Sequence, residues 1–152
     1  MPFVSCRRRR LRPRRAGQAL RGPREALDVI MFAAASPPRP ETICLLLDPA
    51  HRGLTVVIVE GARADHDLLG LAELLLAASV DSGAVGAVVL ATVRPDRSHR
   101  PSGDDELRWF DLRARFDEMG VELLDWFVLS GGLASSLCEL TDSRRRWLED
   151  RP

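Results

Sequence analysis

Short apolar runs, each closed by turn-forming residues, alternate with stretches of helical periodicity along this chain. The runs lie at 42–47, 54–59, 86–91 and 121–129, with a candidate edge strand at 135–140. Apolar runs this short, bounded by Gly, Pro or Asp, are typical of buried β-strands. Between them, apolar residues recur at helical spacing over 67–79 and 103–119, which predicts two amphipathic helices. The alternation predicts an α/β (α+β) fold, with a mixed sheet of about four to six strands flanked by helices.

The 152 residues are enough for one domain with a sizeable core, because 45% of them are hydrophobic. We divide the chain into a basic disordered tail (1–22), a short helix and Pro-rich linker (23–40), the main domain (41–140) and a charged C-terminal tail (141–152). Disorder is expected in the first segment because it is rich in arginine and poor in large apolar residues. Pro23 is suited to open the short helix, which we place at 24–35.

A net charge of zero conceals a division of charge along the chain. Residues 1–24 hold nine arginines and no acid, whereas the rest holds 13 arginines against 22 acids. Such a tail could bind nucleic-acid phosphates by releasing counterions, although no aromatic residues lie among the arginines to stack on bases. Its candidate contacts are Arg7, Arg8, Arg9, Arg10, Arg12, Arg14 and Arg15. A solvated tail, or an upstream start codon misassigned in gene calling, is the competing interpretation.

The remaining composition indicates a cytoplasmic protein. Cys6, Cys44 and Cys138 are odd in number and far apart, which is typical of reduced thiols rather than of disulfides or a cysteine zinc site. The chain has no apolar run of about 18 residues, so no membrane span is expected. No apolar stretch follows the first arginines, so no secretory signal peptide is expected. All 22 basic residues are arginine, which is typical of a GC-rich bacterial genome.

The most specific pattern lies between residues 88 and 129. An apolar strand ends in Thr92-Val93-Arg94-Pro95, a loop brings Pro101-Ser102-Gly103-Asp104-Asp105, and after a helix comes Gly120-Val121-Glu122-Leu123-Leu124-Asp125-Trp126. This order resembles the RadC-like branch of the JAB/MPN (JAMM metalloprotease) family. In that family a strand ends in His-x-His-Pro, a Pro-Ser-x-x-Asp loop follows, and a later strand reads Gly-(Ile/Val)-x-Leu-Leu-Asp-His. The resemblance covers 41–140 and implies a JAB/MPN-like fold.

The family's two histidines fall on Thr92 and Arg94 of this chain, whereas Ser102 and Asp105 match its Ser-x-x-Asp. The resemblance implies that the histidines, two residues apart on one face of a strand, would bind zinc together with the aspartate. Here Thr92 offers a weak neutral oxygen, and the guanidinium of Arg94 offers no lone pair. The chain is therefore similar to a degenerate member of the family, a pseudoenzyme, for which we expect no metal or other cofactor.

Two further positions follow from the resemblance. Glu41, which heads the first strand, matches the glutamate that acts as the family's catalytic base. Asp125 matches the strand aspartate, and Trp126 replaces the histidine beside it. We therefore take Glu41, Thr92, Arg94, Ser102 and Asp105 as candidates for a vestigial site.

Each candidate also has a simpler interpretation. Ser102 and Asp105 form an ordinary capping box at the start of a predicted helix. Arg94 either pairs with Asp105, and in addition with Glu41, in place of a metal, or is a solvated loop arginine. His99, three residues before Ser102, is a weak candidate for a substitute metal ligand with Asp105, and only then is zinc expected.

Three functions remain open from the sequence. The leading hypothesis is a non-catalytic RadC-like domain that serves as an interaction or structural module with an unknown protein partner. The first alternative is a metal-dependent hydrolase that uses Glu41, His99 and Asp105 in a rearranged site. The second is a nucleic-acid-associated protein that binds through its arginine tail. The family name connects it with DNA repair, but a shared fold does not fix an activity.

Overall fold

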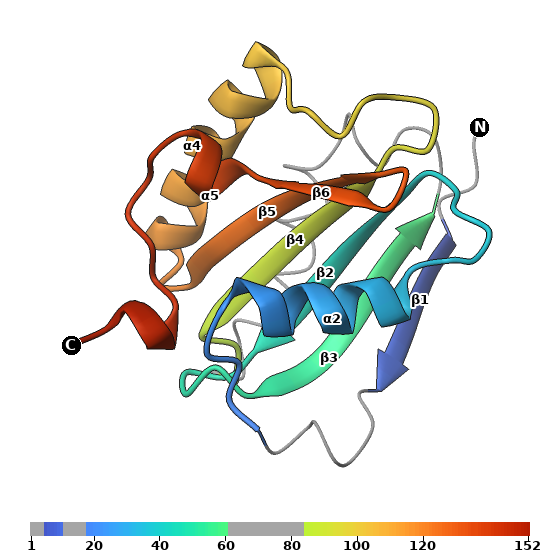
Figure 1. Ribbon diagram of the computed structural model, residues 1–152. Coiled ribbons are helices and arrows are strands. Elements are labelled where there is room, and N and C mark those ends of the chain that lie inside the picture. Colours follow the sequence, from blue (N-terminus) through green and yellow to red (C-terminus); the bar gives the residue numbers. More distant parts are fainter. Residues whose placement is uncertain (1–4, 11–17, 61–83) are drawn as a thin grey trace.

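The computed structural model describes residues 5–10, 18–60 and 84–152, and it forms one six-stranded mixed sheet with helices on both faces (Figure 1). The strands are β1 (Ser5–Arg10), β2 (Glu41–Leu47), β3 (Gly53–Glu60), β4 (Ala87–Val93), β5 (Glu122–Ser130) and β6 (Leu133–Ser136). The helices are α2 (Pro23–Ala33), α4 (Gly103–Glu118) and α5 (Leu137–Leu140), followed by the 3-10 turn η1 (Leu148–Asp150). The predicted mixed sheet flanked by helices is confirmed.

The strand order is β1-β3-β2-β4-β5-β6, and only the β4–β5 pair is parallel among the described strands. Residues 48–52 join β2 to β3 as an antiparallel hairpin. The parallel β4–β5 pair needs a crossover connection, which the loop after β4 and helix α4 provide. This crossover brings the end of β4 next to the start of α4, where the candidate residues lie.

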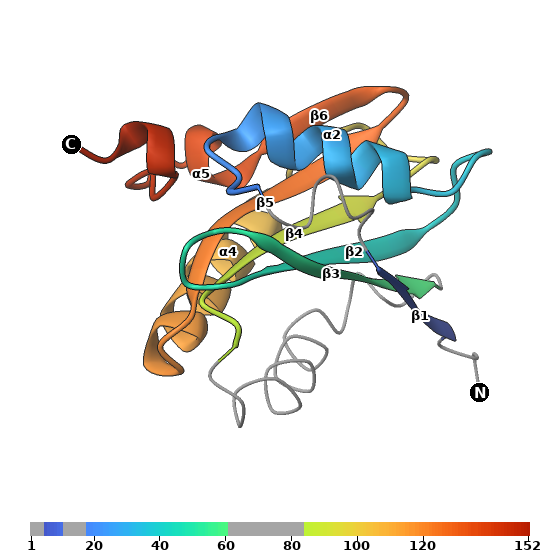
Figure 2. The same ribbon diagram turned by 90° about the horizontal axis from the view of Figure 1, so that it is seen from below.

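Two helices cover opposite faces of the sheet, so the central strands are buried on both sides (Figure 2). Alternate residues of each strand point to opposite faces. Ile43 and Leu45 pack in one core with Ile30 of α2, whereas Cys44 packs in a second core with Trp109 of α4. We call these sides of the sheet the α2 face and the α4 face.

The expectation that 1–22 is disordered is wrong for the parts that the structure describes. Residues Ser5–Arg10 form β1, an edge strand antiparallel to β3. Ala19 forms a β-bridge with Arg52, and Leu20 packs against the α2-face core. The composition argument considers side chains alone, whereas the backbone of a polar segment can still pair with the edge of β3.

The folded unit also extends beyond the predicted domain limits of 41 and 140. Helix α2 buries Ala26, Val29, Ile30 and Ala33 in the α2-face core, so it is part of the domain rather than a linker element. Trp147, in the predicted C-terminal tail, is buried in the same core. Trp147 is the one buried residue of 141–152, so a single large aromatic residue anchors a segment that is otherwise intermediate or exposed.

The predicted strand at 135–140 is half correct, because β6 ends at Ser136 and the next four residues form α5. The Ser136 side chain accepts a hydrogen bond from the Glu139 backbone, which caps that helical turn. The predicted helix at 67–79 lies outside the described residues. Among the residues that the structure describes, no helix has the length and apolarity to cross a membrane.

Candidate functional site

Arg94 and Asp105 form a two-pronged ion pair between the end of β4 and the first turn of α4. The Nη1 and Nη2 atoms of Arg94 donate to Oδ2 and Oδ1 of Asp105 at 2.8 and 2.9 Å. The pair is buried, because Arg94 is 8% exposed and Asp105 is 4% exposed. The interpretation of Arg94 as a solvated loop residue is therefore wrong. Because a planar guanidinium and a carboxylate match in this geometry, the ion pair is both directional and strong.

The capping box predicted from Ser102 and Asp105 is present. Ser102 Oγ accepts from the Asp105 amide at 3.3 Å, and Asp105 Oδ2 accepts from the Ser102 amide at 2.8 Å. Burial raises the pKa of Asp105, but the hydrogen bonds from Arg94 and Ser102 outweigh it and hold the pKa at about 2. Asp105 thus serves as helix cap and as partner of Arg94 at once.

Trp126 of β5 completes this cluster on the α4 face. Its indole Nε1 donates to Thr92 Oγ1 at 2.9 Å, and the guanidinium of Arg94 lies 5.9 Å from the centre of its ring. Thr92 is buried, so the indole N–H has its partner inside the protein. The sequence placed Trp126 at the family's histidine position without predicting either contact. The available signal was that Trp126, like Thr92 and Arg94, stands at a position where the resembled family has histidine.

Glu41 does not join this cluster. It lies opposite Val93 in the β2–β4 pairing, and Val93 belongs to the α2-face core. Directly opposed residues of paired strands share a face, so Glu41 points away from the α4 face. Its Oε1 accepts from the amide of Ala35, just after α2. The expectation that Glu41 pairs with Arg94, or acts beside Asp105, is not met, because the strand's period of two assigns it to the other face.

The cluster does not fit the zinc ion that the family implies. The guanidinium of Arg94 has no lone pair, Thr92 Oγ1 accepts from Trp126, and both oxygens of Asp105 accept from Arg94. Within residues 18–60 and 84–152, no three His, Cys, Asp or Glu side chains gather closely enough to hold a metal. His99 is half-buried in the loop before Ser102 and belongs to no such group.

Asp125 is a second buried carboxyl group, on the opposite face. Val88 pairs with Leu123 and Val89 with Asp125, so the β4–β5 register slips by one residue and turns Asp125 to the α2 face. Its oxygens accept from Ser136 Oγ at 2.5 Å, the Trp126 amide at 2.7 Å and the Cys138 amide at 3.1 Å. Burial raises its pKa to about 6, despite these three hydrogen bonds, which lower it.

The contacts of Asp125 indicate a structural role. They join β5 to the junction of β6 and α5, beside a cavity of about 340 Å³ whose lining includes Leu27 of α2. Asp125 is 2% exposed, so the cavity gives little access to its carboxyl group.

The arginines predicted to bind nucleic acid are divided between two segments. Arg7, Arg8, Arg9 and Arg10 form most of β1, whereas Arg12, Arg14 and Arg15 lie outside the described residues.

The family model described as RadC-like JAB domain matches residues 20–142. The chain belongs to the RadC-like JAB domain family. The match starts at Leu20 and includes α2, which agrees with the wider domain limits seen in the fold. A comparison with curated proteins found no match.

Proposed function

We propose that this RadC-like JAB domain is non-catalytic and serves as an interaction or structural module. The supporting observation is the buried pair of Arg94 and Asp105, which places a permanent cation against the carboxylate that a zinc site would use. A zinc-dependent hydrolase needs lone pairs around the ion and an open position for water. Arg94 supplies a positive charge to the carboxylate, but it provides neither a lone pair for a metal ion nor an open position for water.

The packing around the pair supports the same proposal. Trp126 packs next to Thr92 and Arg94. Its indole N–H donates to Thr92 Oγ1, which would otherwise be a weak metal ligand. Glu41, the expected base, is bound to the backbone on the α2 face. The cluster therefore stabilises the join between β4, β5 and α4, and it offers no group placed to activate water.

Zinc titration of the purified protein tests this proposal. We expect the unaltered chain to bind no stoichiometric zinc by calorimetry and metal analysis. The double variant Thr92→His with Arg94→His restores two imidazoles beside Asp105, so we expect it to gain zinc affinity. Adding Asp105→Asn to that variant should weaken the affinity again. Tight binding of one zinc per unaltered chain, weakened by Asp105→Asn alone, would contradict the proposal.

A second candidate function, nucleic-acid binding, is favoured by one observation. Strand β1 places four successive arginines along an edge of the sheet, rather than in a disordered tail. Successive residues of a strand lie about 3.3 Å apart, so four arginine positions fall within a short length of this edge. Phosphate contacts by such a row would make binding strongly dependent on salt.

The salt dependence of DNA affinity tests the second candidate. We expect log K to fall with log salt, with a slope of about 0.9 for each phosphate contacted. Replacing Arg7, Arg8, Arg9 and Arg10 by Gln should reduce this slope more than the same change at Arg12, Arg14 and Arg15. No binding at low salt, or an equal effect of both sets, would exclude β1 as a binding edge.

A further inference from the structure

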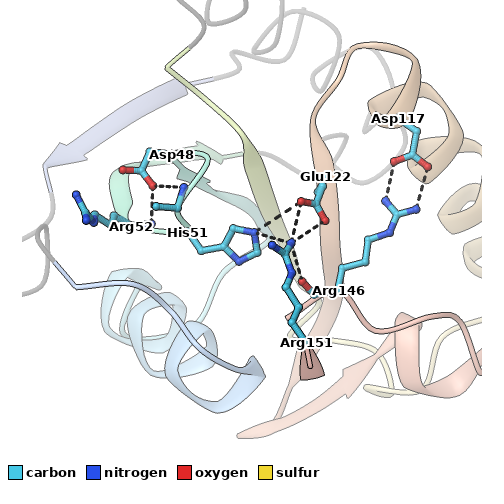
Figure 3. A network of polar contacts seen from close by, with 8 residues as sticks. Asp48, His51, Arg52, Asp117, Glu122, Arg146 and Arg151 are labelled. Carbon is cyan, nitrogen blue, oxygen red and sulfur yellow. Dashed lines mark hydrogen bonds and ion pairs between the residues drawn. The ribbon is translucent and has the colours of Figure 1, made fainter. Parts of the chain in front are cut away.

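His51 is a buried imidazole in the turn between β2 and β3, and the cluster around Arg94 does not involve it. The residue is 1% exposed and has a positive φ of 63°, which is unusual outside glycine. Asp48 holds the turn, because its Oδ1 accepts from the amides of Ala50 and Arg52 at 2.9 and 2.8 Å (Figure 3). These hydrogen bonds therefore hold the backbone turn that carries the imidazole.

Three other parts of the chain meet at His51. Its carbonyl accepts from the Leu20 amide at 2.8 Å, which attaches the segment before α2. Its Nε2 lies 3.5 Å from Nη2 of Arg151, near the C-terminus, and 3.9 Å from Oε1 of Glu122, at the start of β5. Arg151 also donates to Glu122 at 3.0 Å, so the three side chains form one contiguous group (Figure 3).

Arg151 belongs to a C-terminal strap, residues 144–152, which is bound to the domain at several points. Trp147 anchors the strap in the α2-face core. The Glu149 amide donates to the carbonyl of Arg21 at 2.8 Å. Arg146 makes a two-pronged pair with Asp117 of α4 at 2.6 and 3.0 Å (Figure 3).

We propose that protonation of His51 loosens the C-terminal strap, so that docking of the strap depends on pH. A neutral imidazole can present the lone pair of Nε2 to the Arg151 guanidinium, with its proton on Nδ1. Nδ1 is buried and has no hydrogen-bond partner among the described residues. Protonation converts Nε2 to a charged donor, which repels Arg151 and competes with it for Glu122.

The charges that face His51 fix the direction of the effect. Burial lowers the pKa of His51, and Arg151 lowers it further, whereas Glu122 and Asp48 act in the opposite direction. His51 therefore binds a proton less readily when the strap is docked than when it is released. Linkage then requires that docking is strongest above the ordinary histidine pKa of about 6.5 and weakens as pH falls below it.

Hydrogen exchange of the whole chain, read by mass spectrometry of a peptide that contains the Glu149 amide, measures strap release. After correction for intrinsic exchange, we expect the opening constant to rise as pH falls from 7.5 to 5, by up to about tenfold per pH unit. His51→Gln keeps an acceptor but cannot titrate, so this rise should disappear. His99→Gln, in the loop before α4, is the matched control and should behave like the unaltered chain. A pH-independent opening constant in the unaltered chain would overturn the proposal.

A second measurement decides the matter if His51→Gln does not fold. The titration of His51 can be followed by NMR of its imidazole in Arg151→Met and in Glu122→Gln. Removing Arg151 should raise the pKa of His51, and removing the charge of Glu122 should lower it. An unchanged His51 titration in both variants would show that these side chains do not control its proton.

Discussion

The guanidinium of Arg94 meets the carboxylate of Asp105 through two parallel hydrogen bonds, with both groups less than a tenth exposed. The pair spans the crossover of the β4–α4–β5 unit, since Arg94 follows β4 and Asp105 lies in the first turn of α4. Because a buried charge separated from its partner is costly, loss of either residue should destabilise the fold. The pair therefore couples the position of α4 to the sheet.

Arg94→Met is expected to lower the free energy of unfolding by about 3 kcal/mol, because it removes the cation that donates to buried Asp105 and leaves only Arg108, at 4.0 Å. The double variant Arg94→Met with Asp105→Leu should be less destabilised than the sum of the single variants. Urea unfolding of the four proteins measures this coupling. Asp117→Ala, which breaks the more exposed pair with Arg146, is the control and should cost less than about 1 kcal/mol. Equal losses for Arg94→Met and Asp117→Ala would mean that the buried pair has no special role.

Asp105 should also make the fold sensitive to acid. Its pKa is about 2 in the folded protein, below the ordinary 3.8, so the folded state binds fewer protons there than the unfolded state. The stabilisation is complete above about pH 4 and is lost as pH falls toward 2, amounting to about 2 kcal/mol. Unfolding midpoints between pH 4 and 2 measure it. Asp105→Asn should be less stable at pH 4 and should show a smaller loss across this window.

Asp125 should have the opposite effect at higher pH. Its folded pKa of about 6 lies above 3.8, so the folded state holds a proton that the unfolded state has released. Stability should therefore fall as pH rises from 4 to 6, by on the order of 2 kcal/mol. Asp125→Asn can keep the bonds from the Trp126 and Cys138 amides and cannot titrate. This variant should therefore lack the fall in stability due to Asp125, although His51 still titrates in this window, and a slope equal to that of the unaltered protein would assign the effect elsewhere.

Local patterns predicted the features that local physics controls. The capping box at Ser102 and the strand ending near Arg94 follow from neighbouring residues, and both are present. The face on which Glu41 lies was not predictable in this way, because moving a strand position by one residue reverses its side. Asp125 depends on a register slip between β4 and β5, which no local pattern indicates. Strand β1 was missed because its hydrogen bonds come from a distant strand rather than from its own side chains.

Two threonines that oppose each other across β2 and β4 offer the last test. Thr92 and Thr42 form a cross-strand pair and are both buried, but only Thr92 Oγ1 accepts a hydrogen bond from Trp126. Thr42 Oγ1 has no hydrogen-bond partner in the described part of the chain.

Thr92→Val should therefore leave the indole N–H of Trp126 unsatisfied and cost about 1–3 kcal/mol of unfolding free energy. Thr42→Val removes a buried hydroxyl that bonds to nothing described, so it should be neutral or stabilising. Both changes preserve the side-chain shape and the β-branch, which makes each variant the control of the other. Chemical unfolding of the two proteins measures the difference. If Thr42→Val proves as costly as Thr92→Val, the contact with Trp126 does not hold this part of the α4 face together.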